Sequence, residues 1–74
     1  MDISYDTKAD AMYIKFKDGK FKRNKEIEEG IIVDLAADGG ILGIEVLDVS
    51  TKFKPKELAK VNIEMPLHLA GARK

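Results

Sequence analysis

The sequence contains no cysteine and a single histidine. Disulfides therefore cannot form, and a structural zinc site, which takes four Cys or His ligands, has too few donors. Proline and aromatic residues are also scarce, and no apolar run approaches the ~20 residues of a membrane span or forms the apolar region of a signal peptide. These absences predict a cytoplasmic protein without a bound cofactor or metal.

The length of 74 residues predicts one small domain spanning residues 1–74. Domains of this size usually gain stability from disulfides, metals or oligomerisation, because their cores are small. The composition leaves oligomerisation, because it provides neither disulfides nor a zinc site. We therefore expect pairing with a second copy or with a small partner protein. The last residues, 67–74, are expected to be frayed or disordered.

Charge is balanced, with 13 basic and 13 acidic residues, but it is unevenly distributed. Residues 8–25 carry a basic block, residues 26–51 contain acids and no base, and residues 52–60 turn basic again. The basic residues near Asp18 are almost all lysines, a composition common on soluble proteins. We therefore expect no nucleic-acid partner and no membrane partner.

Turn-forming residues recur at short intervals, and the stretches between them are rich in Ile, Val, Tyr and Phe. This pattern predicts a mostly β, α+β fold: an antiparallel β-meander of about five strands. Pro55 suits the first turn of a short helix that would follow the sheet. Val61, Ile63 and Met65 alternate with Asn62 and Glu64, which predicts a sixth strand at an edge.

The central hairpin has a register that can be derived from its turn. A two-residue turn at Asp38-Gly39 would pair Leu35 with Leu42, Val33 with Ile44, and Ile31 with Val46. All six side chains would then share one apolar face. The opposite face would receive Asp34 across from Gly43, and Ile32 across from Glu45.

Two further turns are predicted. A three-residue loop, 28–30, would use Gly30 for its positive φ and place Ile27 with Ile31. A turn at Asp18-Gly19 would set Phe16 opposite Phe21. Extending these registers puts Arg23 and Lys25 on the apolar face. Either their strand is an edge protected by charge, or the two side chains reach a partner.

The acidic residues support more than one interpretation. Asp6 and Asp10 bracket a turn, where Asp side chains commonly accept backbone N–H bonds, and this favours structure over catalysis or metal binding. Asp34 and Glu45 would lie together on the outer face of the central hairpin. They could recognise a basic partner, although a solvated sheet face is the simpler interpretation.

Catalytic motifs are missing from the sequence. It has no cysteine, no Gly-x-Ser-x-Gly and no phosphate-binding glycine-rich loop. His68 lies near the chain end, where rigid support for catalysis is not expected. Tyr5 and Tyr13 are predicted to fill space beside the first turn rather than to react. The sequence therefore favours a role other than catalysis and assigns no catalytic residue.

Three segments carry a family resemblance: YDTKADAMYI, EIEEGIIVDL and DGGILGIEVLDVS, in that order and spacing. Together they resemble a family of small prokaryotic proteins classed as a domain of unknown function, which has no established activity or cofactor. Its members are often encoded beside proteins that resemble RelE-like ribonuclease toxins. The resemblance therefore implies an antitoxin role, although the chain lacks a convincing helix-turn-helix or long C-terminal amphipathic helix.

Three functional hypotheses follow. The leading one is a protein-interaction module that forms a homodimer or pairs with a small partner protein, with Arg23, Lys25, Asp34 and Glu45 as the partner-binding residues. The first alternative is antitoxin-like neutralisation of a RelE-like toxin, and the second is a small enzyme or metal-binding domain that uses Asp and Glu. For the dimer, the charge blocks predict that salt weakens association.

Overall fold

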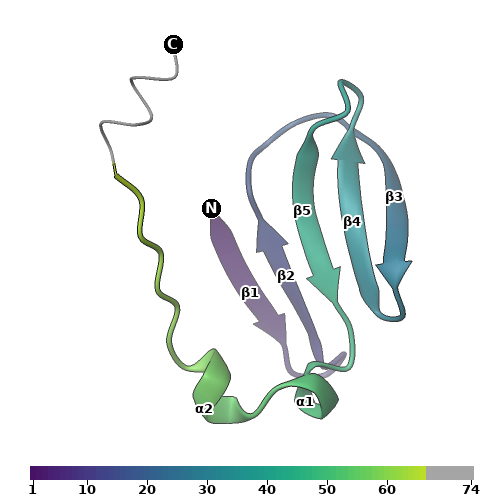
Figure 1. Cartoon of the computed structure of the whole chain (residues 1–74). Helices are drawn as coiled ribbons and strands as arrows, with labels where there is room; N and C mark the ends of the chain where they lie inside the picture. Colours follow the sequence, from purple (N-terminus) through teal and green to yellow (C-terminus); the bar gives the residue numbers. More distant parts are fainter. Residues whose placement is uncertain (67–74) are drawn as a thin grey trace.

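A computed structural model of the chain describes residues 1–66. Five antiparallel strands form one sheet and two four-residue helices follow it (Figure 1). This confirms the predicted mostly β class with about five antiparallel strands. The elements are β1 (Asp2–Asp6), β2 (Ala11–Lys15), β3 (Phe21–Glu28), β4 (Ile31–Ala36), β5 (Ile41–Val46), α1 (Val49–Lys52) and α2 (Pro55–Leu58).

The strand order, β1-β2-β5-β4-β3, differs from that of a meander. Strand β2 pairs with β5 rather than β3, so β2 to β5 form a Greek key. The predicted turn at Asp18-Gly19 is therefore wrong. That hairpin would have placed Ile14 opposite Arg23, whereas in the sheet Ile14 lies opposite Ile44. Apolar cross-strand pairing outweighs the local turn preference.

Residues 16–20 consequently form a connection that passes the ends of β5 and β4 (Figure 1). The Phe16 N–H donates to the Leu42 carbonyl at 2.7 Å, and the Ala37 N–H donates to the Lys20 carbonyl at 3.0 Å. Gly19 lies against the side chains of Leu42 and Ala36, both of which are buried. The connection thus covers the small core at this end of the sheet.

The central hairpin keeps most of its predicted register. Val33 lies opposite Ile44 and Ile31 opposite Val46, as predicted. The turn itself is one residue longer, because the Ala36 N–H donates to the Gly40 carbonyl and Gly39 has a φ of 89°. A bulge beyond Asp34 restores the register, so Leu35 lies opposite Ile41 instead of Leu42.

The β3–β4 turn also differs by one residue. Glu28 pairs with Ile31, so the loop has two residues, and Ile27 is the extra residue of a bulge, with 51% of its surface exposed. The predicted positive φ of Gly30 is confirmed at 78°. The Glu26 carboxylate accepts the Gly30 N–H at 2.9 Å, which holds this turn.

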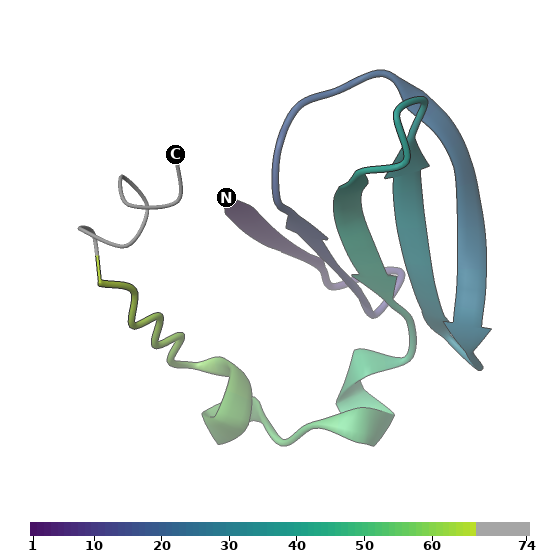
Figure 2. The same cartoon turned by 45° about the horizontal axis from the view of Figure 1, so that its top comes forward.

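After the sheet, the helix predicted from Pro55 is present as α2, where the Lys54 N–H donates to Glu57 Oε1 at 2.8 Å. Helix α1 was not predicted. The predicted sixth strand is not seen: among the described residues, 61–65 belong to no strand, and they lie apart from the sheet (Figure 2). The predicted fraying of residues 67–74 lies outside the described residues.

Candidate protein-interaction surface

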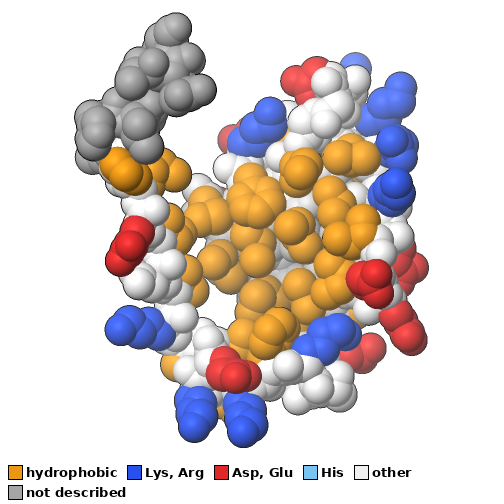
Figure 3. All heavy atoms as spheres, in the orientation of Figure 1, with side chains coloured by type: hydrophobic (Ala, Val, Ile, Leu, Met, Phe, Trp, Pro, Cys, Tyr) orange, Lys and Arg blue, Asp and Glu red, His pale blue; other side chains and the backbone are white. Residues whose placement is uncertain are grey.

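One face of the sheet is apolar across four of its five strands. The cross-strand pairs that share this face are Ile3 with Ile14, Tyr5 with Met12, Ile14 with Ile44, Met12 with Val46, Ile31 with Val46 and Val33 with Ile44. Figure 3 shows a continuous hydrophobic area over the sheet. We call the set Ile3, Tyr5, Met12, Ile14, Ile31, Val33, Ile44 and Val46 the apolar face.

No second layer within residues 1–66 covers the apolar face, although five of its eight side chains are half-buried among their neighbours and Val46 is buried. Among the described residues, only four hydrophobic side chains are buried: Ala36, Leu42, Val46 and Val49. Ile3 and Tyr5 are 42% and 45% exposed, and no second layer of strands or long helices lies over the sheet in the described part of the chain. A sheet normally buries its apolar side against another layer, so this face lacks its usual cover.

A groove runs along the β1 side of this face. Ile3, Tyr5 and Met12 form one wall, Pro55 and Leu58 of α2 form the other, and the volume is about 360 Å³. A second hollow of about 330 Å³ shares Tyr5, Pro55 and Leu58 and continues to its other lining residues, Val49, Ser50 and Phe53. Neither lining includes a carboxylate or a basic group.

Arg23 and Lys25 lie at the rim of the apolar face. Strand β3 is an edge strand of the sheet, and these residues pair with Leu35 and Val33 respectively. Both are exposed, and a bulge between Phe21 and Arg23 interrupts the ladder. The charged edge that the sequence predicted is therefore present, and the long stems leave the charged groups in water.

Asp34 and Glu45 lie on the opposite, polar face, as predicted. Asp34 pairs with Gly43, while Glu45 pairs with Ile32 on one side and with Tyr13 on the other. The four predicted partner-binding residues are thus divided between the two faces and do not form a single site.

On the polar face, the Tyr13 ring lies directly against Gly43. A Cβ at position 43 would collide with the Tyr13 ring and lie 2.6 Å from the Ile14 carbonyl oxygen, so only glycine fits there without movement. Burial, together with the neighbouring Asp34 carboxylate, raises the pKa of Tyr13. The close fit of the Tyr13 ring against Gly43 gives this part of the polar face a packing role.

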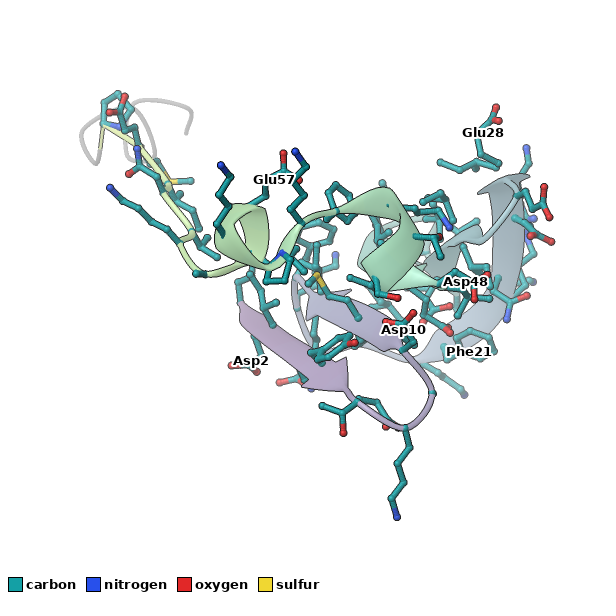
Figure 4. The ribbon with its side chains drawn as sticks, turned by 90° about the horizontal axis from the view of Figure 1, so that it is seen from below. Asp2, Asp10, Phe21, Glu28, Asp48 and Glu57 are labelled. Carbon is teal, nitrogen blue, oxygen red and sulfur yellow. The ribbon has the colours of Figure 1, made fainter. Side chains whose placement is uncertain are left out.

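Asp10 joins two segments that the sequence treated separately. Its carboxylate accepts the Tyr5 hydroxyl at 2.6 Å and the Ser50 hydroxyl at 2.7 Å, and it also accepts the Ser50 N–H (Figure 4). Its backbone carbonyl accepts the Val49 N–H at 3.0 Å. Asp10 therefore ties the β1–β2 turn to the start of α1. In the sequence, the only indication of this link was that Tyr5, Asp10 and Ser50 all lie in the segments that resemble the family.

The same hydrogen bonds shift the pKa values of Asp10 and Tyr5. Donation by Tyr5 and by Ser50 lowers the pKa of Asp10, and the bond to Asp10 raises the pKa of Tyr5. Asp6 has the local role that was predicted, because its carboxylate accepts the N–H groups of Lys8 and Ala9. These acids hold backbone and side chains, and neither is among the residues that line the grooves beside the apolar face.

Within residues 1–66, no three His, Cys, Asp or Glu side chains converge to hold a metal ion, and no helix is long and apolar enough to cross a membrane. The family model described as "Protein of unknown function (DUF2283)" matches residues 2–50. No curated protein and no solved structure matches the chain.

Proposed function

Since the chain belongs to the DUF2283 family of proteins of unknown function, its role has to be inferred from its own surfaces, and we propose that it is a self-associating interaction module. In this proposal two copies pack their apolar faces together as a two-layered sandwich. The observation that carries it is the uncovered apolar face. Packed sheets lie about 10 Å apart with their inner side chains interdigitated.

The exposed apolar side chains lie where such an interface would form. The apolar face spans β1, β2, β5 and β4, and its outermost side chains, Ile3 and Tyr5, are 42% and 45% exposed. A continuous apolar surface that crosses four strands is the kind of surface that contact with a partner needs.

The charges are compatible with this arrangement. Arg23 and Lys25 are at the β3 rim, where their side chains can stay in solvent when the faces close. Asp34 and Glu45 are on the outer side of such a sandwich. No charged side chain would have to be buried at the centre, so the cost that opposes burial of ions does not arise.

An interface also agrees better with the geometry than catalysis does. An enzyme would need a hollow with converging acids or bases. The grooves beside the apolar face have no acid or base in their linings, which are Ile3, Ser4, Tyr5, Met12, Val49, Ser50, Phe53, Pro55, Leu58 and Ala59. Two smaller hollows, of about 200 and 100 Å³, do carry acids and lysines, including Lys17 and Asp18, but most of these side chains are exposed, as on a solvated loop.

Sedimentation of the purified chain at micromolar concentration tests the proposal. We expect a dimer of twice 8.2 kDa, that is 16.4 kDa. Val33→Asp places a charge on the apolar face and should dissociate the dimer, because an unpaired buried carboxylate costs several kcal/mol. Ile32→Asp is the matched control, since the adjacent residue points to the polar face, and it should remain dimeric.

A folded wild-type monomer at 100-fold higher concentration would refute self-association, and it needs no variant. Circular dichroism checks that Val33→Asp is still folded; if it is not, the concentration dependence of wild-type unfolding provides the same test, because a dimer gains stability with protomer concentration. A chain that stays monomeric until mixed with a different small protein would instead favour the antitoxin-like alternative.

A further inference from the structure

The segment Val61–Met65 has the alternating pattern of a strand, but no strand of residues 1–66 lies beside it. Val61, Ile63 and Met65 are 60%, 56% and 65% exposed, and they alternate with Asn62 and Glu64. The segment leaves α2 and lies apart from β1 in both views (Figures 1 and 2). Three apolar side chains with a period of two therefore face water.

Strand β1 offers a complementary edge. It pairs with β2 on one side, and its other side has no partner strand among residues 1–66. Such an edge presents unpaired N–H and C=O groups that another strand can bind. Two β1 strands are poorly suited to each other, because antiparallel pairing centred on Ser4 would place Asp2 opposite Asp6 twice.

We propose that Val61–Met65 of one copy adds as a strand to the β1 edge of a second copy. Pairing centred on Ser4 and Asn62 places Val61 and Ile63 beside Ile3 and Tyr5 of the second copy, whichever direction the strand runs. Those side chains then extend the second copy's apolar face. The same pairing sets Lys60 opposite one of Asp2 and Asp6, and Glu64 opposite the other. One attractive contact thus offsets one repulsive contact, whereas β1 paired with β1 has two repulsive contacts. Pro66 follows the segment and ends the ladder, because proline has no N–H to donate.

The occupant is a second copy because the segment does not pair with its own sheet. It lies apart from its own β1 edge and forms no ladder with it in the described chain (Figures 1 and 2). Only Ala59 and Lys60 separate it from α2, and so short a hinge favours exchange of a segment between copies. Exchange of both segments around a two-fold axis would cover both edges. This inference rests on the self-association proposed above.

The absence of cysteine makes a direct test possible. Two single-cysteine variants, Ser4→Cys and Asn62→Cys, are mixed, one of them isotopically labelled, and oxidised slowly. Directly opposed strand residues have Cα atoms about 4.5–5.5 Å apart, within the range of a disulfide. We expect a mixed disulfide to form at least about tenfold faster than in the control mixture of Lys22→Cys with Asn62→Cys, because Lys22 lies on the opposite edge strand.

Mass spectrometry identifies the mixed product, and sedimentation of the reduced samples is measured in parallel. A dimer whose mixed disulfide forms no faster than the control would overturn the strand exchange and leave self-association intact. A rapid disulfide within one chain of the double variant Ser4→Cys/Asn62→Cys, without the mixed product, would also overturn it. Monomers in every reduced sample would overturn both proposals.

Discussion

Replacing Gly43 with alanine tests the packing between the polar face and the β2–β5 ladder. An alanine Cβ would lie 2.6 Å from the Ile14 carbonyl oxygen and 2.6 Å from Cζ of Tyr13, whereas ordinary contacts begin near 3.4 Å. The Tyr13 ring can turn aside, but the Ile14 oxygen belongs to the backbone of β2. The neighbouring strands must therefore separate by several tenths of an ångström.

The expected magnitude is the balance of two effects. Overpacking of this kind costs roughly 1–3 kcal/mol. Alanine also restricts the unfolded chain more than glycine does, which returns about 0.4–1 kcal/mol. We therefore expect Gly43→Ala to lower the free energy of unfolding by about 1.3 kcal/mol, the middle of a range from about 0 to 2.6 kcal/mol. Urea unfolding, followed by circular dichroism at one fixed protomer concentration, measures the change.

Gly40→Ala is the matched control. A Cβ there would meet the Lys17 ammonium nitrogen at 2.8 Å and Asp38 Oδ1 at 3.1 Å, and both atoms are at the ends of exposed side chains that can shift. Its stability should stay within about 0.5 kcal/mol of the wild type. In a Tyr13→Ala background, the cost of Gly43→Ala should fall without vanishing, because the Ile14 oxygen remains. If Gly43→Ala were as stable as Gly40→Ala, the close packing of β2 on Gly43 would be refuted.

Three further outcomes are expected. Ile44→Ala should cost about 2–5 kcal/mol in urea unfolding if a second copy covers the apolar face, and a loss below about 1 kcal/mol would speak against that cover. Asp10→Asn should return the raised pKa of Tyr5 toward 10.0, read by ultraviolet titration in a Tyr13→Phe background, and an unchanged midpoint would contradict the hydrogen bond. The pKa of Asp10 is lowered from 3.8 in the folded state, so the ionised carboxylate stabilises the fold above that value, and this stabilisation is lost as the pH falls through the lowered pKa. In the Asp10→Asn variant, the free energy of unfolding should therefore fall less steeply between about pH 5 and pH 2 than in the wild type. Salt should weaken the dimer by less than roughly tenfold between about 0.05 M and 0.5 M, because the charges are at the rim, and a steeper dependence in sedimentation would favour an ionic interface.

Local patterns were enough to predict the central hairpin. The alternation of Ile31, Val33, Ile44 and Val46 predicted that all four share a face, and the assumed turn selected the pairing of Val33 with Ile44, which the structure has. The prediction held although the turn was wrong by one residue, because a bulge in β5 compensates for the longer loop. The outward placement of Asp34 followed from the same alternation.

Contacts between distant residues could not be predicted in this way. Asp18-Gly19 has the sequence of a tight turn, but whether it forms one depends on the alternatives open to β2. Pairing with β5 sets Ile14 opposite Ile44, and that pairing outweighs a local preference. The link between Asp10 and Ser50 spans 40 residues and leaves no periodicity in the sequence.

The sequence by itself determined which side chains share a face, because the period of two in a strand depends only on neighbours along the chain. The tertiary structure decided which strands are neighbours, which edges stay open and whether the apolar face is covered. Those outcomes depend on the free energies of competing long-range pairings. For Val61–Met65 the alternation is present, but a strand also needs a partner, and the described chain does not provide one.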